Sequence, residues 1–245
     1  MKTPLRSPAA GAAFLLFFLA MRAFALDADE IVRKADGARG LDAAYSFLVK
    51  VKNTGRDGMQ EAHYKVYIKG YESCLVDTVY PERQQGRKLL MLGNDLWFYT
   101  PSIKRPTRVS LQQKLTGEVA NGDIAKTNFA HDYDASVLGE EVLNGKKYYH
   151  LDLRAKRKDA TYRRIEYWVE FGTFYPYQVK FYAITGKLLK TGIYGDVRPI
   201  LGRPRMGRLT IRDAIQNSRQ SVLEYSGHKM ERLDDAFFSK ESLAP

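Results

Sequence analysis

The predicted fold depends most on Leu89 to Ser110, which reads LLMLGNDLWFYTPSIKRPTRVS. A short apolar run ends at Gly93-Asn94-Asp95 and restarts as Leu96-Trp97-Phe98-Tyr99 before Thr100-Pro101 interrupts it. Turn residues between two apolar and aromatic runs indicate a β-hairpin. The basic segment from Ser102 to Ser110 follows, with no acid–base pair, poised nucleophile or set of metal ligands. This stretch therefore predicts a hairpin of apolar side chains followed by a cationic segment, without chemistry of its own.

Runs of the same kind surround this hairpin on both sides. Residues 45–52 and 63–69 alternate apolar and polar side chains with a period of two, which is typical of an antiparallel sheet packed on one face. The pair Asn144-Gly145 between two such runs is a type I′ turn signature. The other predicted strands are 72–79, 87–92, 96–100, 136–143, 147–155, 162–171, 177–184, 187–194, 207–212 and 220–225. Prolines and a glycine make 197–205 a predicted loop.

Three segments do not follow the strand pattern. Residues 26–41 have apolar positions at helical spacing after Asp27 or Asp29, which can cap a helix. Residues 111–132 have few β-branched residues and predict a helical or irregular excursion, called the lid here. Residues 233–243 predict a short terminal helix or an extended docking segment. We expect a mainly β single domain of about ten to twelve antiparallel strands, in a strongly curled sheet or incomplete barrel.

The N-terminus has the layout of a secretory signal peptide. Lys2 and Arg6 precede an apolar run too short to span a membrane, and Ala23-Phe24-Ala25 is a small-x-small cleavage pattern. We expect cleavage after Ala25, which leaves residues 26–245 as the mature domain outside the cytoplasm; an uncleaved anchor is the alternative. The whole chain carries a net charge of +11, and residues 1–25 hold three basic and no acidic residues, so the mature charge is about +8. Anionic lipids, acidic glycans or an acidic protein suit this charge, and nucleic acid is not expected as a partner.

No grouping of residues marks a catalytic or metal site. The four histidines lack metal-ligand spacing, and His131-Asp132-Tyr133-Asp134 has no second cluster to complete it. Asp152, Glu166 and Glu170 alternate with basic residues, which indicates cross-strand ion pairs on a solvent face. Cys74, the single cysteine, lies in a strand-like run and is expected to be a small buried residue. We therefore expect a protein that is not an enzyme and needs no metal or cofactor.

Dense aromatic groups on the predicted strands either fill a core or line a cavity for an acyl chain. The predicted cavity wall consists of Leu89, Met91, Trp97, Tyr99, Tyr167, Trp168 and Phe181. Arg105 and Arg108 are predicted to contact a head group at the mouth. The other basic clusters, near 154–164 and 198–212, are either solvated strand faces or contacts for lipid phosphates or an acidic partner.

The order Asp95-Leu96-Trp97-Phe98-Tyr99-Thr100-Pro101, followed by Arg105, Arg108 and Val109, resembles the LolA-like family of outer-membrane lipoprotein-sorting proteins. The segments Asp123 to Asp134 and Tyr175-Pro176 and the ending Phe238 to Leu243 agree with it. The resemblance implies an incomplete, bent antiparallel β-barrel with helices that close its mouth. It also implies a periplasmic carrier that shelters lipoprotein acyl chains or another lipid between the inner and outer membranes.

The same resemblance leaves other functions open. A fold-sharing envelope sensor that regulates a protein partner is one, and a lipid carrier that works with an export pump is another; a secreted hydrolase with an unrecognised site is a third. Within the carrier hypothesis, we expect a monomer with an inner-membrane transporter as a possible donor and an outer-membrane acceptor. In the best-known carriers an arginine inside the cavity works with the lid, and Arg105 and Arg108 are the candidates by position.

Overall fold

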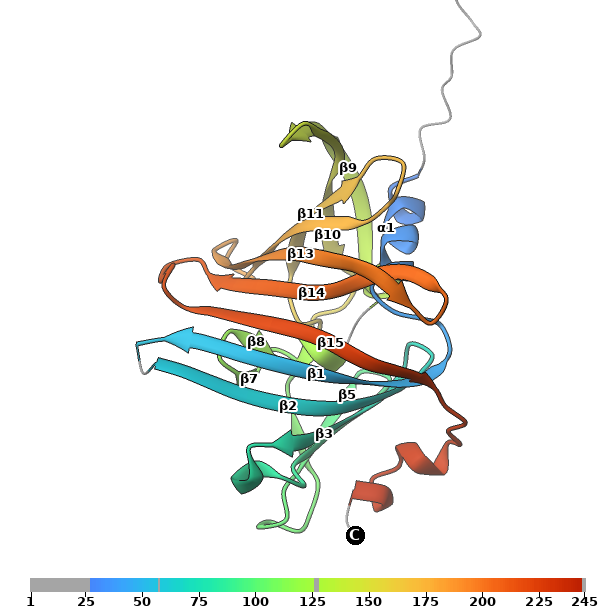
Figure 1. Cartoon of the computed structure of the whole chain (residues 1–245), viewed down its shortest axis with the longest axis vertical. Coiled ribbons are helices and arrows are strands. Elements are labelled where there is room, and N and C mark those ends of the chain that lie inside the picture. The colour runs from blue at the N-terminus through green and yellow to red at the C-terminus, as the bar shows by residue number, and fades with distance from the viewer. Residues whose placement is uncertain (1–26, 57, 126–127, 244–245) are drawn as a thin grey trace, which may run out of the picture.

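The computed structural model describes residues 27–56, 58–125 and 128–243. Within these ranges, thirteen strands form one antiparallel sheet in the order β6-β5-β4-β3-β2-β1-β15-β14-β13-β12-β11-β10-β9. The sheet is strongly curled and stays open, with β6 and β9 at its edges (Figure 1). Neighbours in the sheet are also neighbours in sequence, except where β1 pairs with β15 and joins the two ends of the chain. The predicted mainly β, incomplete barrel is confirmed.

Most elements are strands, as the hairpin turns predicted. The strands of the sheet are β1 (Ala44–Gly55), β2 (Gly58–Lys69), β3 (Ser73–Tyr80), β4 (Lys88–Leu92), β5 (Asp95–Tyr99), β6 (Thr107–Val109), β9 (Tyr133–Leu143), β10 (Lys146–Ala155), β11 (Arg164–Glu170), β12 (Pro176–Tyr182), β13 (Leu188–Ile200), β14 (Arg203–Asp213) and β15 (Gln220–Met230). The remaining elements are α1 (Ala28–Gly37), η1 (Glu82–Gln84), β7 (Lys114–Thr116), β8 (Val119–Ala120), α2 (Asn121–Ala125), α3 (Phe129–Asp132), η2 (Ala236–Phe238) and η3 (Glu241–Leu243).

The concave face of the sheet holds the main hydrophobic core. Alternation along each strand sends one set of side chains inward, as with Phe47, Val49 and Val51 of β1. Helix α1 lies against this core through Ile31 and Val32, and the acidic residues of its first turn suit the positive end of the helix dipole. The predicted N-terminal helix is therefore confirmed.

The lid contains a two-stranded ribbon, β7–β8, and the short helices α2 and α3. It crosses the open side of the curled sheet, behind β1 and β15 in the view of Figure 1. Apolar side chains from the lid enter the main core, and among them are Leu111, Val119, Ile124 and Phe129. At the ribbon turn, a Cβ on Gly117 would collide with Asn53 of β1, and the φ of +50° at this position also favours glycine.

The convex face of β2 to β5 carries a second, smaller cluster. Leu75, Leu90 and Tyr99 are buried there under Phe238 and Leu243 of the C-terminal segment. This segment, η2 and η3, lies beside β3 and β4 at the lower right of Figure 1. The expectation that residues 233–243 form a docking segment is confirmed, with two short 3₁₀ turns in place of a helix.

The prediction of a loop at 197–205 is wrong, because β13 and β14 continue through it. Pro199 and Pro204 lie opposite each other, and a non-hydrogen-bonded pair of an antiparallel ladder needs no N–H. The turn between them is Leu201-Gly202, with φ values of 47° and 77°. Such left-handed values at both central residues match a type I′ turn, and leucine is an unusual residue at its first position. The predicted turn at Asn144-Gly145 has the same signature, with φ values of 52° and 78°.

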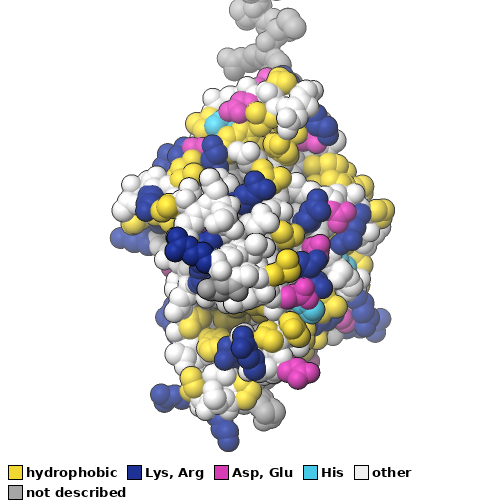
Figure 2. Space-filling view, turned by 60° about the vertical axis from the view of Figure 1, so that its left-hand side comes forward, with side chains coloured by type: hydrophobic (Ala, Val, Ile, Leu, Met, Phe, Trp, Pro, Cys, Tyr) yellow, Lys and Arg dark blue, Asp and Glu magenta, His cyan; other side chains and the backbone are white. Residues whose placement is uncertain are grey.

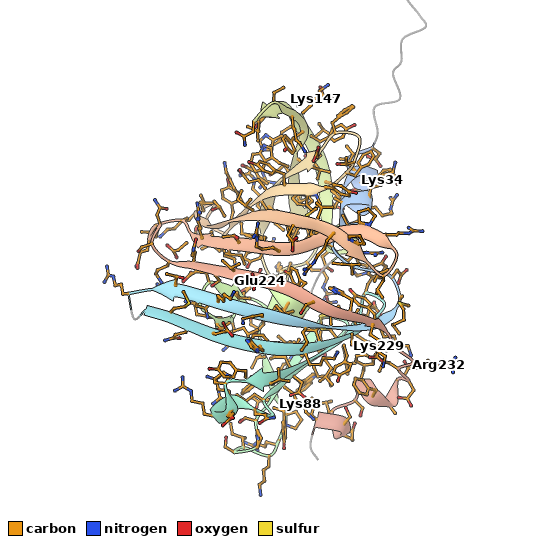
Figure 3. The ribbon with its side chains drawn as sticks, in the orientation of Figure 1. Lys34, Lys88, Lys147, Glu224, Lys229 and Arg232 are labelled. Atoms are coloured by element: carbon orange, nitrogen blue, oxygen red, sulfur yellow. The ribbon has the colours of Figure 1, made fainter. Side chains whose placement is uncertain are left out.

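Many charged side chains lie at the surface, and exposed Lys147 and Lys229 are labelled in Figure 3. The expected cross-strand ion pairs are present between β10 and β11, where Arg164 contacts Asp152 and Lys146 contacts Glu170 at 2.8 Å; Arg164 also contacts Glu166 on its own strand. The expectation of a solvent face is wrong for Asp152, which is buried. Figure 2 shows basic side chains spread over the face in view, with acidic ones among them.

Cys74 is buried, as expected. Within the described ranges, no helix is both long and apolar enough to cross a membrane. The predicted signal peptide, residues 1–25, lies outside the described residues, and the cleavage site stays a prediction.

Candidate functional site

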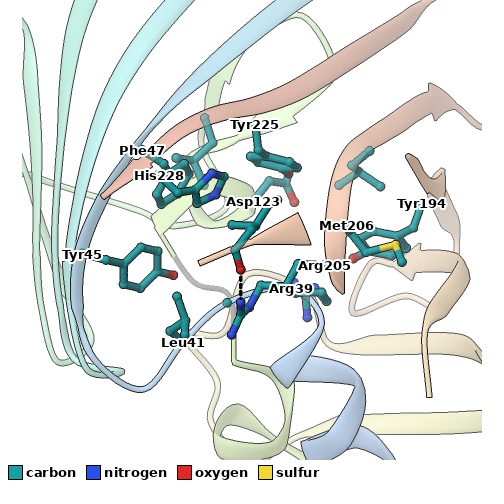
Figure 4. Close-up of a pocket in the computed structure, with 14 residues that line it drawn as sticks. Arg39, Leu41, Tyr45, Phe47, Asp123, Tyr194, Arg205, Met206, Tyr225 and His228 are labelled. Carbon is teal, nitrogen blue, oxygen red and sulfur yellow. Dashed lines mark hydrogen bonds between the residues drawn. The ribbon is translucent and has the colours of Figure 1, made fainter. Parts of the chain in front are cut away.

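A small cavity lies between the lid and the concave face, near the end of the sheet where α1 leads into β1 (Figure 4). Its volume is about 40 Å³. Strands β1, β13, β14 and β15 supply most of its wall, α2 covers it with Asp123 and Ile124, and Arg39 enters from the loop after α1. The complete lining is Arg39, Gly40, Leu41, Tyr45, Phe47, Asp123, Ile124, Tyr194, Ile200, Arg205, Met206, Leu209, Tyr225 and His228. We call this space the inner cavity.

An irregularity in strand pairing brings His228 to the inner cavity. The register between β1 and β15 shifts between Ser46 and Leu48, opposite Gly227, which has a φ of +61°. Such a bulge moves the following side chain to the other face of the sheet. His228 therefore stacks on Phe47 with 5.1 Å between the ring centroids, and Tyr225 approaches the same ring at 6.1 Å.

Arg39 and Asp36 form a buried ion pair between the end of α1 and the lid. Their charged groups are 2.9 Å apart, and the other Asp36 oxygen accepts a 2.8 Å hydrogen bond from the Ala130 backbone N–H in α3. The Arg39 guanidinium lies over the Phe129 ring, 3.8 Å from its centroid. Burial raises the pKa of Asp36 to about 6, against the opposing effect of Arg39. This pair connects the end of α1 to the lid.

A second buried ion pair attaches α2 to the sheet. Lys190 of β13 lies 2.5 Å from Asp123 and also donates to the Glu118 carbonyl at 2.7 Å. The Tyr162 hydroxyl donates to the other Asp123 oxygen at 2.7 Å, and burial raises the Tyr162 pKa well above its ordinary value. Both carboxylate oxygens and the ammonium therefore have partners, as buried charges require.

Arg205 differs from these two pairs. Its side chain is buried, with the whole residue only 5% exposed, and its guanidinium donates to the Ile200 carbonyl. Its Nε has no hydrogen-bond partner, and no carboxylate of the described residues lies within ion-pair distance of it. Burial, together with nearby Arg203, lowers the pKa of Arg205.

Burial and nearby positive charges also change the pKa of His228. Burial, followed by the charges of Arg198 and Arg205, lowers its pKa to about 4. The imidazole is therefore neutral at neutral pH, and it adds no positive charge beside Arg205.

A second cavity, of about 220 Å³, lies under the other end of the lid. Leu89 and Phe98 of the β4–β5 hairpin form part of its wall, opposite Leu115 and Gln113 of the lid. The inner cavity and this second cavity thus lie on the same concave face, with the lid over both.

The structure divides the predicted cavity wall between the two faces of the sheet. Leu89, Met91, Tyr167 and Phe181 belong to the main core on the concave face. Among these four, only Leu89 lines a cavity described above.

For Trp97, Tyr99 and Trp168 the expected position on the cavity wall is wrong, because alternation places them on the convex face. Trp97 and Tyr99 pack in the cluster under the C-terminal segment, where Lys240 lies over the Trp97 ring. Trp168 stacks on His150 at 4.1 Å and donates to Glu141 at 2.9 Å.

The two arginines predicted to contact a head group do not line the inner cavity. Arg105 is exposed in the loop before β6, and Arg108 is exposed on β6 and pairs with Asp95 across the edge of the sheet. The arginines that line the inner cavity are Arg39 and Arg205. Sequence reasoning missed Arg39, which follows the helix as an ordinary loop residue. It included Arg205 only as one member of the basic cluster at 198–212, in a segment predicted as a loop, and did not place it in a cavity.

The inner cavity offers mainly apolar contacts. Its acidic groups are held in ion pairs, His228 is stacked on Phe47, and the rest of the lining is largely aromatic and aliphatic. In the described part of the chain, no group of three or more His, Cys, Asp or Glu side chains is arranged to hold a metal ion. The chemistry that this arrangement supports is the burial of apolar groups beside one unpaired cation.

Comparisons with known proteins show which family and fold this chain is similar to. A family model described as an uncharacterized protein matches residues 70–245. A LolA superfamily protein from Nitrosomonas europaea is 37% identical; the match covers 89% of this chain and 100% of that protein, with a TM-score of 0.85. No curated protein sequence matches the chain.

Two further solved structures share the fold at lower identity. A domain named for outer membrane lipoprotein sorting, from Vibrio parahaemolyticus, is 20% identical over 88% of this chain and 97% of its own, with a TM-score of 0.75. A DUF1329 family protein from Desulfovibrio piger is 21% identical over the same shares, with a TM-score of 0.76.

Proposed function

This chain belongs to the LolA superfamily, and from that premise we propose that it is a periplasmic carrier. The carrier binds lipoprotein acyl chains or another acyl lipid between the concave face and the lid, and it moves this cargo between the inner and outer membranes. The proposal assigns the protein no catalytic step, and it describes a monomer that meets an inner-membrane donor and an outer-membrane acceptor.

The observation that carries this proposal is the way in which the lid covers the concave face. Its apolar side chains, such as Val119 and Ile124, occupy positions on the core that an acyl chain could take instead. Each methylene moved out of water contributes about 0.8 kcal/mol, so a chain can replace the lid at little net cost to the core.

The lid is also attached by contacts that water can replace on opening. Asn53 of β1 donates to Thr116 at 2.8 Å, and the Glu118 N–H donates to the Ser221 hydroxyl at 2.8 Å. With the ion pairs at Asp36 and Asp123, these contacts hold the closed state. Because ligand pockets usually reach about 300–1,000 Å³, the closed inner cavity of about 40 Å³ requires this lid to move before a chain can enter.

Two measurements on the mature protein, residues 26–245, test the proposal. The protein is purified from the periplasm, its bound lipid is extracted, and the lipid is identified by mass spectrometry. We expect acyl lipid in near-stoichiometric amount. The same protein should accelerate transfer of a fluorescent phospholipid between donor and acceptor vesicles.

Recovery of no lipid would contradict the binding step. Recovery of lipid without any acceleration of transfer would contradict the carrier step and favour a sensor of the same fold.

A further inference from the structure

Two buried cationic side chains around the inner cavity each have a carboxylate partner, and a third cationic side chain has none. Arg39 is matched by Asp36, and Lys190 is matched by Asp123. Among the cationic groups that line the cavity in the described structure, Arg205 is buried without a carboxylate. The inner cavity therefore carries an excess of one positive charge.

An unpaired buried guanidinium is unfavourable unless a ligand supplies the missing partner. Removing a charge from water is strongly unfavourable, and one carbonyl contact at Ile200 offsets this cost only in part. The Arg205 Nε is buried and has no hydrogen-bond partner at all. Guanidinium groups bind carboxylates and phosphates through two parallel N–H donors, and Nε with one terminal nitrogen forms such a pair.

The surroundings of Arg205 suit one small anion attached to an apolar chain. The inner cavity has room for a group the size of about three water molecules. Phe47, Met206 and Leu209 also line this cavity, and they offer apolar contacts to the first methylenes of a chain. His228 is stacked and neutral, so it competes with Arg205 for the anion less than a cation would.

We propose that Arg205 binds the carboxylate or phosphate oxyanion at the head of an acyl lipid, and that the chain runs from there along the concave face under the lid. This inference rests on the proposed carrier function and adds to it the chemical class of the ligand's polar end.

Isothermal titration of the mature protein tests the assignment with five compounds. Myristate and myristyl phosphate carry the anion and the chain, methyl myristate carries the chain alone, and acetate and inorganic phosphate carry the anion alone. We expect the two anionic amphiphiles to bind at least about tenfold more tightly than the ester. Acetate and inorganic phosphate should bind far more weakly than either.

Two variants locate the preference. Arg205→Gln should reduce the preference for myristate over methyl myristate to about twofold or less, while its affinity for the ester stays near that of the wild type. Arg203→Gln is the matched control, because Arg203 is two residues earlier on β14 and exposed. It should keep the full preference.

A spectroscopic signal supplements the variants if Arg205→Gln fails to fold. Myristate bound beside His228 should shift the imidazole resonances of the wild-type protein and raise the His228 pKa, and methyl myristate should not raise it.

The outcomes separate the two proposals. Equal affinity of the wild type for myristate and its methyl ester overturns the anion site and leaves the carrier intact. Binding of acetate as tight as that of myristate overturns the assignment to a lipid head group. If none of the amphiphiles binds, the carrier proposal fails as well.

Discussion

At the residue scale, buried charges control how the lid meets the sheet. Asp123 and Lys190 have side chains only 4% and 8% exposed, and each satisfies the other. Asp36 and Arg39 form a second buried ion pair, at the end of α1. Removing one partner of such a pair leaves a charge in a place where water cannot reach it.

The first prediction concerns Lys190. Lys190→Met leaves the Asp123 carboxylate buried without its cation, and we expect the free energy of unfolding to fall by about 3–5 kcal/mol. Urea denaturation followed by far-UV circular dichroism measures it. Lys187→Met is the control, because Lys187 is exposed just before β13, and it should change stability by less than about 0.5 kcal/mol. If Lys190→Met lost as little unfolding free energy as Lys187→Met, the result would contradict a stabilising role for the Lys190–Asp123 ion pair.

The second prediction concerns pH and Asp36. Burial raises the folded-state pKa of Asp36 to about 6, from 3.8. The folded state therefore binds more protons than the unfolded state between these values, so this residue makes stability fall as pH rises from about 4 to about 6.

Asp36→Asn removes this titration. The stability of the wild type relative to Asp36→Asn should fall over that pH window by up to about 3 kcal/mol and then stay constant. Denaturation of both proteins at each pH gives the difference. A difference independent of pH would show that the carboxyl keeps its ordinary pKa.

The residues of the inner cavity could be predicted from sequence only in part. Phe47 was placed correctly on the inner face of a strand because its neighbours alternate. The position of His228 could not be predicted. The bulge at Gly227 depends on how β15 pairs with β1, a strand far away in the sequence. The unpaired state of Arg205 depends on which side chains surround it, and no local pattern carries that information.

At the scale of elements, the sheet is covered on both faces where β4 and β5 lie. The C-terminal segment covers the convex face, and the lid covers the concave one. The run Leu96 to Tyr99 is therefore apolar on both sides of the strand, and its alternation is lost. This is why the hairpin itself was predicted correctly and the face of Trp97 was not.

The same physical reasoning explains which strands were found. The hairpin at Asn144-Gly145 was predicted because residues that favour left-handed turn positions are recognisable locally. The β13–β14 hairpin was missed because Leu201 occupies a left-handed position and two prolines flank it. Neither β12 nor β15 pairs with this end of the hairpin, so the prolines remove no hydrogen bond there.

The third prediction follows from the face of the tryptophans. Trp97→Phe and Trp168→Phe alter the convex face only, so we expect each variant to bind myristate within about twofold of the wild type. Titration of the two variants measures this directly. Loss of binding in either variant would move the ligand site to the convex face.

The fourth prediction concerns the closed position of the lid. A Cβ at Gly122 of α2 would collide with Thr161, so Gly122→Ala should displace the lid from the sheet. We expect faster amide hydrogen exchange in β8 and α2, with the exchange of β1 and β15 little changed. Gly139→Ala is the control, because a Cβ at Gly139 of β9 meets nothing within 4 Å. Equal exchange in both variants would contradict a lid that opens separately.

At the scale of the whole molecule, the pairing of β1 with β15 makes one continuous curled sheet from both ends of the chain. Its concave face gathers the apolar side chains of strands and lid into one core. The inner cavity lies where this core meets α1, α2 and the β13–β15 strands (Figure 4). We therefore expect lipid to bind on the concave face under the lid.

Photo-crosslinking tests that claim most directly. The mature protein is loaded with a myristate analogue that carries a diazirine on its chain, irradiated, digested and mapped by mass spectrometry. The account predicts labels on residues of the concave face and the lid, such as Phe47, Ile124 and Leu209, and competition by unlabelled myristate. Labels confined to the convex face, or to the exposed edge strand β9, would contradict it.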